Sequence, residues 1–405
     1  MTSTTRWVGI CIVVSCIGLV GFFFLRTPAV PAHTPVTNLT QSDDSSVVVT
    51  PVDLIPPTTA TNEATAPTEG SPTTEAPLST EPITQPISTP STRSLARIVF
   101  AADFASDGGC ADHSETDACD LFTATLNLQT GEVGSVKQIT DTSVSESYPV
   151  WNPNGSVAYA SVFETYTKKF LHFVNLTTSE TGRIISNATW PDIHPDGSTL
   201  FYVTSDTHLL MQTSLSSDGL NVGTSTKVTG SKNQEDPDVS PDGQSIVFHQ
   251  IGSDGAHGVV LDRATESTVA FSDRSGHCAF SGSGDFVVCD NSRGGGLYRR
   301  TYTNKTLGES SLFVADLKPS QIAVYDNAFT SCGGTSFNYP TFCGDDTHLL
   351  ASTSCNTDTK GGVSFSRLFL IDVSGSTPVY HAIGNDLADA FDGPGKSSWT
   401  VDCLP

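Results

Sequence analysis

A turn motif that recurs every 41 to 46 residues limits how this chain can fold more than any other feature. Its clearest copy, residues 237–248, reads Pro-Asp-Val-Ser-Pro-Asp-Gly and continues into Gln-Ser-Ile-Val-Phe. Further copies, some of them weaker, occupy residues 149–160, 191–203, 277–289 and 340–351. The glycines at positions 155, 197, 243 and 284 are 42, 46 and 41 residues apart. This period is typical of an array of four-stranded sheets, each built from one repeat.

Each part of the motif has a physical role. Proline and aspartate suit the middle of a tight turn, and the following glycine accepts the positive φ that closes a hairpin. The residues after the glycine are β-branched and aromatic, as in a buried strand. Six such strands are predicted, at residues 97–101, 157–160, 200–203, 246–248, 286–289 and 348–351.

The first of these strands has no turn motif before it, so its sheet lacks an inner strand. Residues 397–402, near the C-terminus, have the composition of that missing strand, with Trp399 in the place that Trp151 takes in its own repeat. We therefore predict an all-β, six-bladed β-propeller in residues 94–405, closed by pairing of the C-terminus with the first blade. Closure of the ring removes exposed sheet edges.

The repeats resemble those of the TolB-like family of β-propellers. The signature of that family is Pro-Asp-x-Ser-Pro-Asp-Gly before a short apolar strand, and residues 237–248 match it almost completely. The resemblance covers residues 96–403 and implies a propeller whose mouth and rim hold protein partners. The chain lacks the separate N-terminal α/β domain of TolB itself, so the resemblance does not extend to the envelope partners of TolB.

Two segments precede the predicted propeller. Residues 8–25, within an N-terminal segment 1–26, form an uncharged apolar run of 18 between Arg6 and Arg26. A bilayer-spanning helix needs about 17–25 apolar residues and a signal-peptide core only about 7–15, so the run favours a single-pass transmembrane anchor over a cleaved signal. Thr, Ser and Pro make up more than half of residues 27–93, which predicts a disordered, extended stalk.

The charge balance excludes one class of function. The chain has 20 basic and 43 acidic residues, a net charge of −23, and residues 94–405 alone carry −19. Nucleic-acid binding needs clustered Lys and Arg, so we expect no nucleic-acid partner. An acidic domain favours a basic protein or cations instead.

Cysteines predict the compartment. Eight of the ten cysteines lie in the propeller region, an even number, and no Cys-x-x-Cys pair suggests a metal cluster. Proximity in sequence predicts the disulfides Cys110–Cys119, Cys278–Cys289, Cys332–Cys343 and Cys355–Cys403. Disulfides form in oxidising compartments, so we expect the propeller on the extracytoplasmic side of the cell membrane, or secreted if the N-terminal segment is cleaved.

A candidate site lies where the inner strands of the blades begin, at one end of the central channel. Aromatic and carboxylate side chains that converge on such a mouth can bind a cation, a sugar or a basic peptide. The predicted mouth residues are Glu146, Tyr148, Trp190, Glu235, Asp236, His277 and Tyr339. The ten histidines are scattered along the sequence and suggest no ligand set, so we expect no metal and no cofactor.

Three functions fit these residues. The first is a protein-binding or scaffold module with an unknown protein or glycan partner. The second is a surface polysaccharide lyase or glycoside hydrolase that uses a carboxylate pair such as Glu146 and Glu235. The third is a purely structural head that binds nothing. The sequence has no Gly-x-Ser-x-Gly elbow and no His-Glu-x-x-His zinc helix, which favours binding over catalysis.

Overall fold

The computed structural model describes residues 94–102, 119–165, 167–253, 255–291, 295–322, 334–356, 366–383 and 400–404. Every described residue belongs to one compact unit, Thr84–Pro405. The predicted transmembrane helix and stalk lie outside the described residues. In the described ranges, no helix combines the length and the apolar composition that crossing a bilayer requires.

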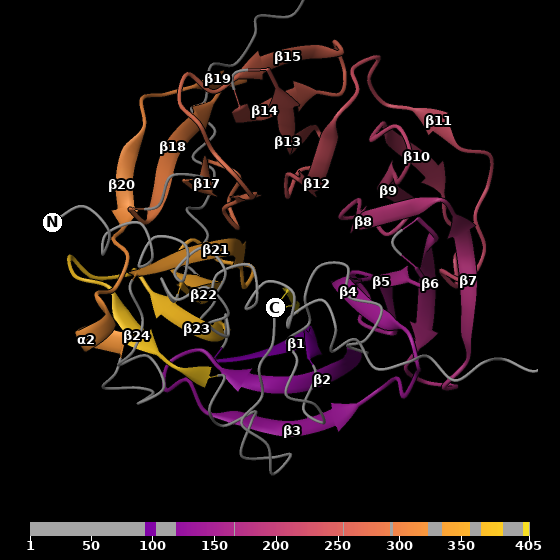
Figure 1. Cartoon of the computed structure of the whole chain (residues 1–405), viewed down its shortest axis with the longest axis horizontal. Helices are drawn as coiled ribbons and strands as arrows, with labels where there is room; N and C mark the ends of the chain where they lie inside the picture. The colour runs from indigo at the N-terminus through magenta and orange to yellow at the C-terminus, as the bar shows by residue number, and fades with distance from the viewer. Residues whose placement is uncertain are drawn as a thin grey trace, which may run out of the picture. The chain divides into compact units, whose positions relative to one another are not determined.

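The described strands form six antiparallel sheets arranged around a common centre (Figure 1). The inner strands are β25 (Val401–Leu404), β4 (Ser145–Trp151), β8 (Ala188–Ile193), β12 (Gln234–Val239), β16 (Cys278–Phe280) and β21 (Gly334–Phe342). The second strands are β1 (Leu95–Ala102), β5 (Val157–Phe163), β9 (Thr199–Thr204), β13 (Ser245–Gly252), β17 (Phe286–Asp290) and β22 (His348–Asn356). All six predicted apolar strands are confirmed as second strands.

The outer half of each blade continues the same meander. The third strands are β2 (Asp120–Asn127), β6 (Lys169–Asn175), β10 (Leu210–Ser214), β14 (Gly255–Asp262), β18 (Leu297–Thr303) and β23 (Ser366–Asp372). The outer strands are β3 (Val133–Gln138), β7 (Thr181–Ser186), β11 (Thr226–Lys227), β15 (Ser267–Ala270), β19 (Thr306–Leu307), β20 (Ser311–Val314) and β24 (Val379–His381). One short helix, α2 (Pro319–Ile322), precedes the sixth blade.

The C-terminus closes the ring by pairing with the first blade. Strand β25 runs antiparallel to β1, with Ile98 opposite Cys403 and Phe100 opposite Val401. The expected closure is therefore confirmed. The strand spans Val401–Leu404 rather than residues 397–402, and Trp399 lies outside the described residues.

The hydrophobic core lies between neighbouring blades rather than inside one sheet pair. One cluster, for example, packs Tyr159 and Leu171 of the second blade against Leu200 and Tyr202 of the third. A blade is therefore buried on both faces, which explains why its second strand is a nearly continuous apolar run. Every residue of β5 is buried.

The motif glycines close the first hairpin of the blades. Gly197 and Gly243 adopt φ values of +74° and +69°. Each donates its N–H to a carbonyl three residues earlier, Gly197 to His194 and Gly243 to Ser240. A side chain at either position would be strained in this left-handed conformation, which is why the repeat needs glycine there.

The disulfides confirm one predicted pair and correct two. Cys278 and Cys289 are bonded as expected, with Cα atoms 4.0 Å apart. Cys403, however, bonds to Cys343 across the closure between the sixth and first blades, with Cα atoms 4.9 Å apart. The predicted pairs Cys332–Cys343 and Cys355–Cys403 are therefore wrong, because ring closure brings together cysteines 60 residues apart. Cys119 is also disulfide-bonded, and its expected partner Cys110 lies outside the described residues.

Candidate functional site at the channel mouth

Four of the six described inner strands share a bulge close to the channel mouth. Strand pairing shifts by one residue in β4, β8, β12 and β21, in each case around an X-Pro step. The residue before the proline has a left-handed backbone, with φ of 54°, 49°, 52° and 51° at Tyr148, Trp190, Asp236 and Tyr339. Non-glycine residues rarely adopt this conformation, and bulges and strained residues concentrate at functional sites.

The aromatic members of this set contact one another across blade boundaries. The Tyr148 ring lies 5.8 Å from that of Trp190 and 6.0 Å from that of Tyr339, measured between centroids. His277 extends the row, with its ring centroid 3.6 Å from that of Tyr339. At the other end, the Trp190 ring lies 5.7 Å from the ring of His208.

Glu235 closes this row into a circle. Its Oε1 lies 3.0 Å from Nδ1 of His208, and its Oε2 lies 3.9 Å from Nδ1 of His249. The ring of His249 in turn lies 6.1 Å from that of His277. We call the seven side chains of this circle the mouth ring: Tyr148, Trp190, His208, Glu235, His249, His277 and Tyr339. It draws on five consecutive blades.

All members of the mouth ring except His249 line a hollow of about 540 Å³. Its lining comprises Tyr148, Thr167, Lys169, Asn187, Trp190, Ser205, Asp206, His208, Glu235, His277 and Tyr339. Pockets that bind ligands have volumes of about 300–1,000 Å³ and combine apolar and aromatic walls with a few polar groups. The hollow has the size and lining of such a pocket.

Below the hollow, three buried carboxyls accept hydrogen bonds from the inner strand of a neighbouring blade. Oδ2 of Asp192 accepts the N–H of Val239 at 2.6 Å, and Oδ2 of Asp238 accepts that of Phe280 at 2.8 Å. Asp402 accepts the N–H of Trp151 in the same way, at 2.7 Å. Burial raises the pKa of all three, to about 8 for Asp238. These aspartates line the narrow channel together with Asp236, and their hydrogen bonds give them a structural role.

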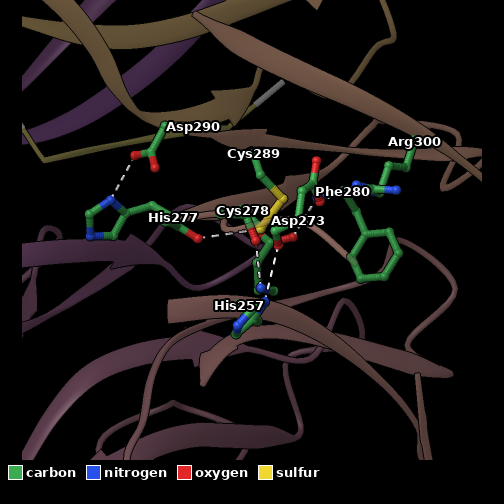
Figure 2. Close-up of a disulfide and its surroundings, with 12 residues drawn as sticks. His257, Asp273, His277, Cys278, Phe280, Cys289, Asp290 and Arg300 are labelled. Carbon is green, nitrogen blue, oxygen red and sulfur yellow. Dashed lines mark hydrogen bonds and ion pairs between the residues drawn. A yellow bond between two sulfur atoms is a disulfide. The ribbon is translucent and has the colours of Figure 1, made fainter. Parts of the chain in front are cut away.

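A disulfide supports the mouth ring in the fifth blade. Figure 2 shows the Cys278–Cys289 bond with His277 and Asp290 beside it. Nδ1 of His277 lies 2.8 Å from Oδ2 of Asp290, whose side chain is almost fully buried. The orientation of the His277 ring is thus held by a fixed carboxylate.

Comparison with known proteins identifies the fold. Neither a protein-family model nor a curated protein sequence matches the chain. Among solved structures, TolB from Acinetobacter baumannii matches 70% of this chain and 63% of its own length, at 16% identity and a TM-score of 0.50. Putative TolB from Agrobacterium tumefaciens matches 77% of this chain and 99% of its own, at 12% identity and a TM-score of 0.47.

The domain is a TolB-like six-bladed β-propeller. Its match to the Acinetobacter protein spans less than two thirds of that protein, and identities this low establish the fold alone. What this TolB-like propeller binds must therefore be argued from its own mouth ring.

The TolB-like propeller brings together most, but not all, of the predicted site residues. Tyr148, Trp190, Glu235, His277 and Tyr339 line the hollow. Asp236 shares their backbone position and lines the channel below. The remaining residue, Glu146, does not line the hollow.

Glu146 is fully buried in the second blade. Its Oε2 accepts a short hydrogen bond from Thr140, and its Oε1 lies 3.2 Å from Nε2 of His172. Burial raises the pKa of Glu146 to about 8 and lowers that of His172 to about 4. The carboxylate pair Glu146–Glu235 expected for glycoside chemistry is therefore not assembled at the mouth.

Sequence reasoning missed two members of the mouth ring, His208 and His249. His249 lies opposite Glu235 in the hairpin of β12 and β13, a pairing that counting outward from Gly243 and allowing for the bulge would have found. His208 lies in the loop between β9 and β10, and no local pattern marks it. Three histidines thus converge at the mouth of the TolB-like propeller, but no group of three or more His, Cys, Asp or Glu residues in the described ranges has the geometry of a metal site.

Proposed function

We propose that this chain is a membrane-anchored, extracytoplasmic propeller that binds a segment of a partner protein in the hollow at its channel mouth. The observation that carries the proposal is the mouth ring, in which aromatic side chains from separate blades surround one hollow. Aromatic residues dominate the binding energy of protein interfaces. The hollow accommodates a few side chains of an extended segment, and Asn187, Ser205 and Asp206 at its edge offer hydrogen-bonding groups to the peptide backbone.

The location rests on separate features. The apolar run at residues 8–25 has the length of a membrane anchor, and residues 27–93 have the composition of a stalk. The disulfides Cys278–Cys289 and Cys343–Cys403 fit an oxidising compartment. A non-permeant protease applied to intact cells should remove a C-terminal tag, and deletion of residues 8–25 should release the protein from the membrane fraction.

Selection from a random peptide library tests the binding function. The full-length chain, reconstituted in lipid nanodiscs, should retain peptides that the Trp190→Ala variant fails to retain. Leu312→Ala is the matched control, because Leu312 is an exposed apolar residue on the outer strand β20, away from the hollow. If Trp190→Ala retained the same peptides as the unmodified chain, the mouth would not be the binding site.

A further inference from the structure

The charge of the mouth ring bears on what the hollow can hold. Glu235 is its carboxylate; its Oε1 lies 3.0 Å from Nδ1 of His208, and the Glu235 side chain keeps 20% of its surface exposed. The neighbouring His249 does not balance this charge. Burial, together with the nearby His277, lowers the pKa of His249 to about 4, so its ring is neutral at physiological pH. Neither ring nitrogen of His249 meets a hydrogen-bond partner among the described residues.

Further charged groups of both signs line the hollow. Asp206 lies on its edge, and its pKa is lowered, chiefly by a hydrogen bond from Asn187, so this carboxyl is ionised. Lys169 contributes an opposing positive charge to the lining, and its Nζ lies over the Phe163 ring, 5.1 Å from the centroid. With a net charge of −19, residues 94–405 add a long-range field that attracts cations.

The aromatic geometry provides the contact surface for a cation. The rings of Trp190 and Tyr339 flank that of Tyr148 at interplanar angles of 62° and 55°. The face of an aromatic ring carries partial negative charge and attracts a Lys ammonium or an Arg guanidinium within about 6 Å, most strongly at Trp. Aromatic faces and a carboxylate at one hollow form a recognition site for a positively charged side chain.

We infer that the mouth ring binds a basic side chain, an arginine or a lysine, of the partner segment, with the cation against the faces of Trp190 and Tyr148 and paired with Glu235. This inference rests on the proposed function, since it names the group by which the partner is recognised. A hollow that selected apolar or acidic side chains would not place a partly exposed carboxylate in its wall, because covering that group with them is costly.

Four short peptides test the inference directly on the full-length chain in nanodiscs. The probes are Gly-Gly-X-Gly-Gly pentapeptides, acetylated and amidated at their ends, with arginine, lysine, citrulline or norleucine as X. We expect a cationic probe to bind about tenfold or more tightly than its neutral counterpart, by titration calorimetry or fluorescence. Trp190→Leu and Glu235→Gln should each weaken that binding about tenfold.

The controls distinguish recognition of the cation by the mouth ring from general electrostatic attraction to an acidic protein. Glu132→Gln removes one exposed carboxylate from the turn between β2 and β3, outside the hollow, and should leave binding of the cationic probe unchanged. Equal binding of cationic and neutral probes, or loss of binding in Glu132→Gln comparable to that in Glu235→Gln, would overturn the inference. Absence of measurable binding by any probe would overturn it as well.

The library selection distinguishes this inference from the proposed function. Peptides that need Trp190 and carry no basic residue would refute the inference and leave the binding function intact. Failure of the mouth to retain any peptide would refute the proposed function.

Discussion

His277 and Asp290 face each other across the first hairpin of the fifth blade, with Nδ1 of the histidine 2.8 Å from Oδ2 of the aspartate. The two residues directly flank the disulfide-bonded pair Cys278 and Cys289, which lie opposite each other in the strand register (Figure 2). A covalent bond therefore fixes the strand ends from which a member of the mouth ring and its carboxylate partner project.

Removal of this disulfide should affect both stability and binding. The variant Cys278→Ala/Cys289→Ala should lose about 3 kcal/mol of unfolding free energy, because a loop of this length restricts the unfolded chain by that amount. The variant should also retain less of the peptides whose binding depends on Trp190, because the disulfide no longer fixes the strand from which His277 projects. Urea titration and peptide capture measure the two effects. Reduced stability with unchanged capture would show that the His277–Asp290 contact does not depend on the disulfide.

The closing disulfide should contribute more to stability. Cys343 and Cys403 are 60 residues apart in sequence, so the variant Cys343→Ala/Cys403→Ala should lose about 4 kcal/mol. In this variant, the backbone amides of β25 and β1 should exchange hydrogen faster than those of the other inner and second strands. The reason is that the closing strand is no longer bonded covalently to the sixth blade. Uniform exchange across all six blades would contradict a special role for the closing bond.

Glu146 should make stability fall as pH rises from 6.5 to 8. Its pKa is raised to about 8, so between pH 4.5 and 8 the folded state holds a proton that the unfolded state releases. His172, with its pKa lowered to about 4, acts in the opposite direction, but only below pH 6.5. Between pH 6.5 and 8, Glu146 should therefore remove about 2 kcal/mol of unfolding free energy.

The variant Glu146→Gln isolates this contribution. Glutamine keeps the shape of the side chain and an acceptor for Thr140 but has no proton to lose. Urea titrations at pH 6.5 and 8 should show a smaller decrease for the variant than for the unmodified chain. An equal decrease in the two proteins would mean that Glu146 titrates normally in the folded state.

The Asp238 carboxyl accepts a hydrogen bond from the neighbouring blade. Replacing it by an amide should preserve stability, whereas replacing it by a methyl group should reduce stability. Asp238→Ala leaves the buried N–H of Phe280 without its acceptor and should cost about 1–3 kcal/mol. Asp238→Asn keeps an acceptor oxygen. Since burial raises the pKa of Asp238 to about 8, the unmodified chain loses stability as pH rises through that value. The Asn variant should lose less, because only the other buried carboxyls, such as Glu146, still release a proton. Thermal unfolding at pH 6 and 9 provides the comparison, and equal losses for Ala and Asn would contradict it.

The repeat itself determined the architecture. The spacing of Gly155, Gly197, Gly243 and Gly284 predicts the blades, since a left-handed turn residue and a following apolar run are local properties of the chain. The same local pattern places Tyr148, Trp190 and Tyr339 directly before the prolines at the bulges of inner strands, and thereby at the mouth. Cys278 and Cys289 were also predictable, because both belong to one hairpin.

Other features depend on contacts between blades, which no local pattern encodes. The bond between Cys343 and Cys403 follows from closure of the ring, and nearness in sequence predicted different partners. The difference between Glu146 and Glu235, by contrast, follows from strand alternation. Glu146 precedes the bulge residue Tyr148 by two positions and is buried against His172 of its own blade, whereas Glu235 precedes Asp236 by one position and lines the hollow. His208 reaches the mouth from a loop of the third blade. The sequence by itself thus determined the blades and their order, through turns and strands that span a few residues. Only the tertiary structure decided which side chains meet, because packing between sheets joins residues far apart in the chain.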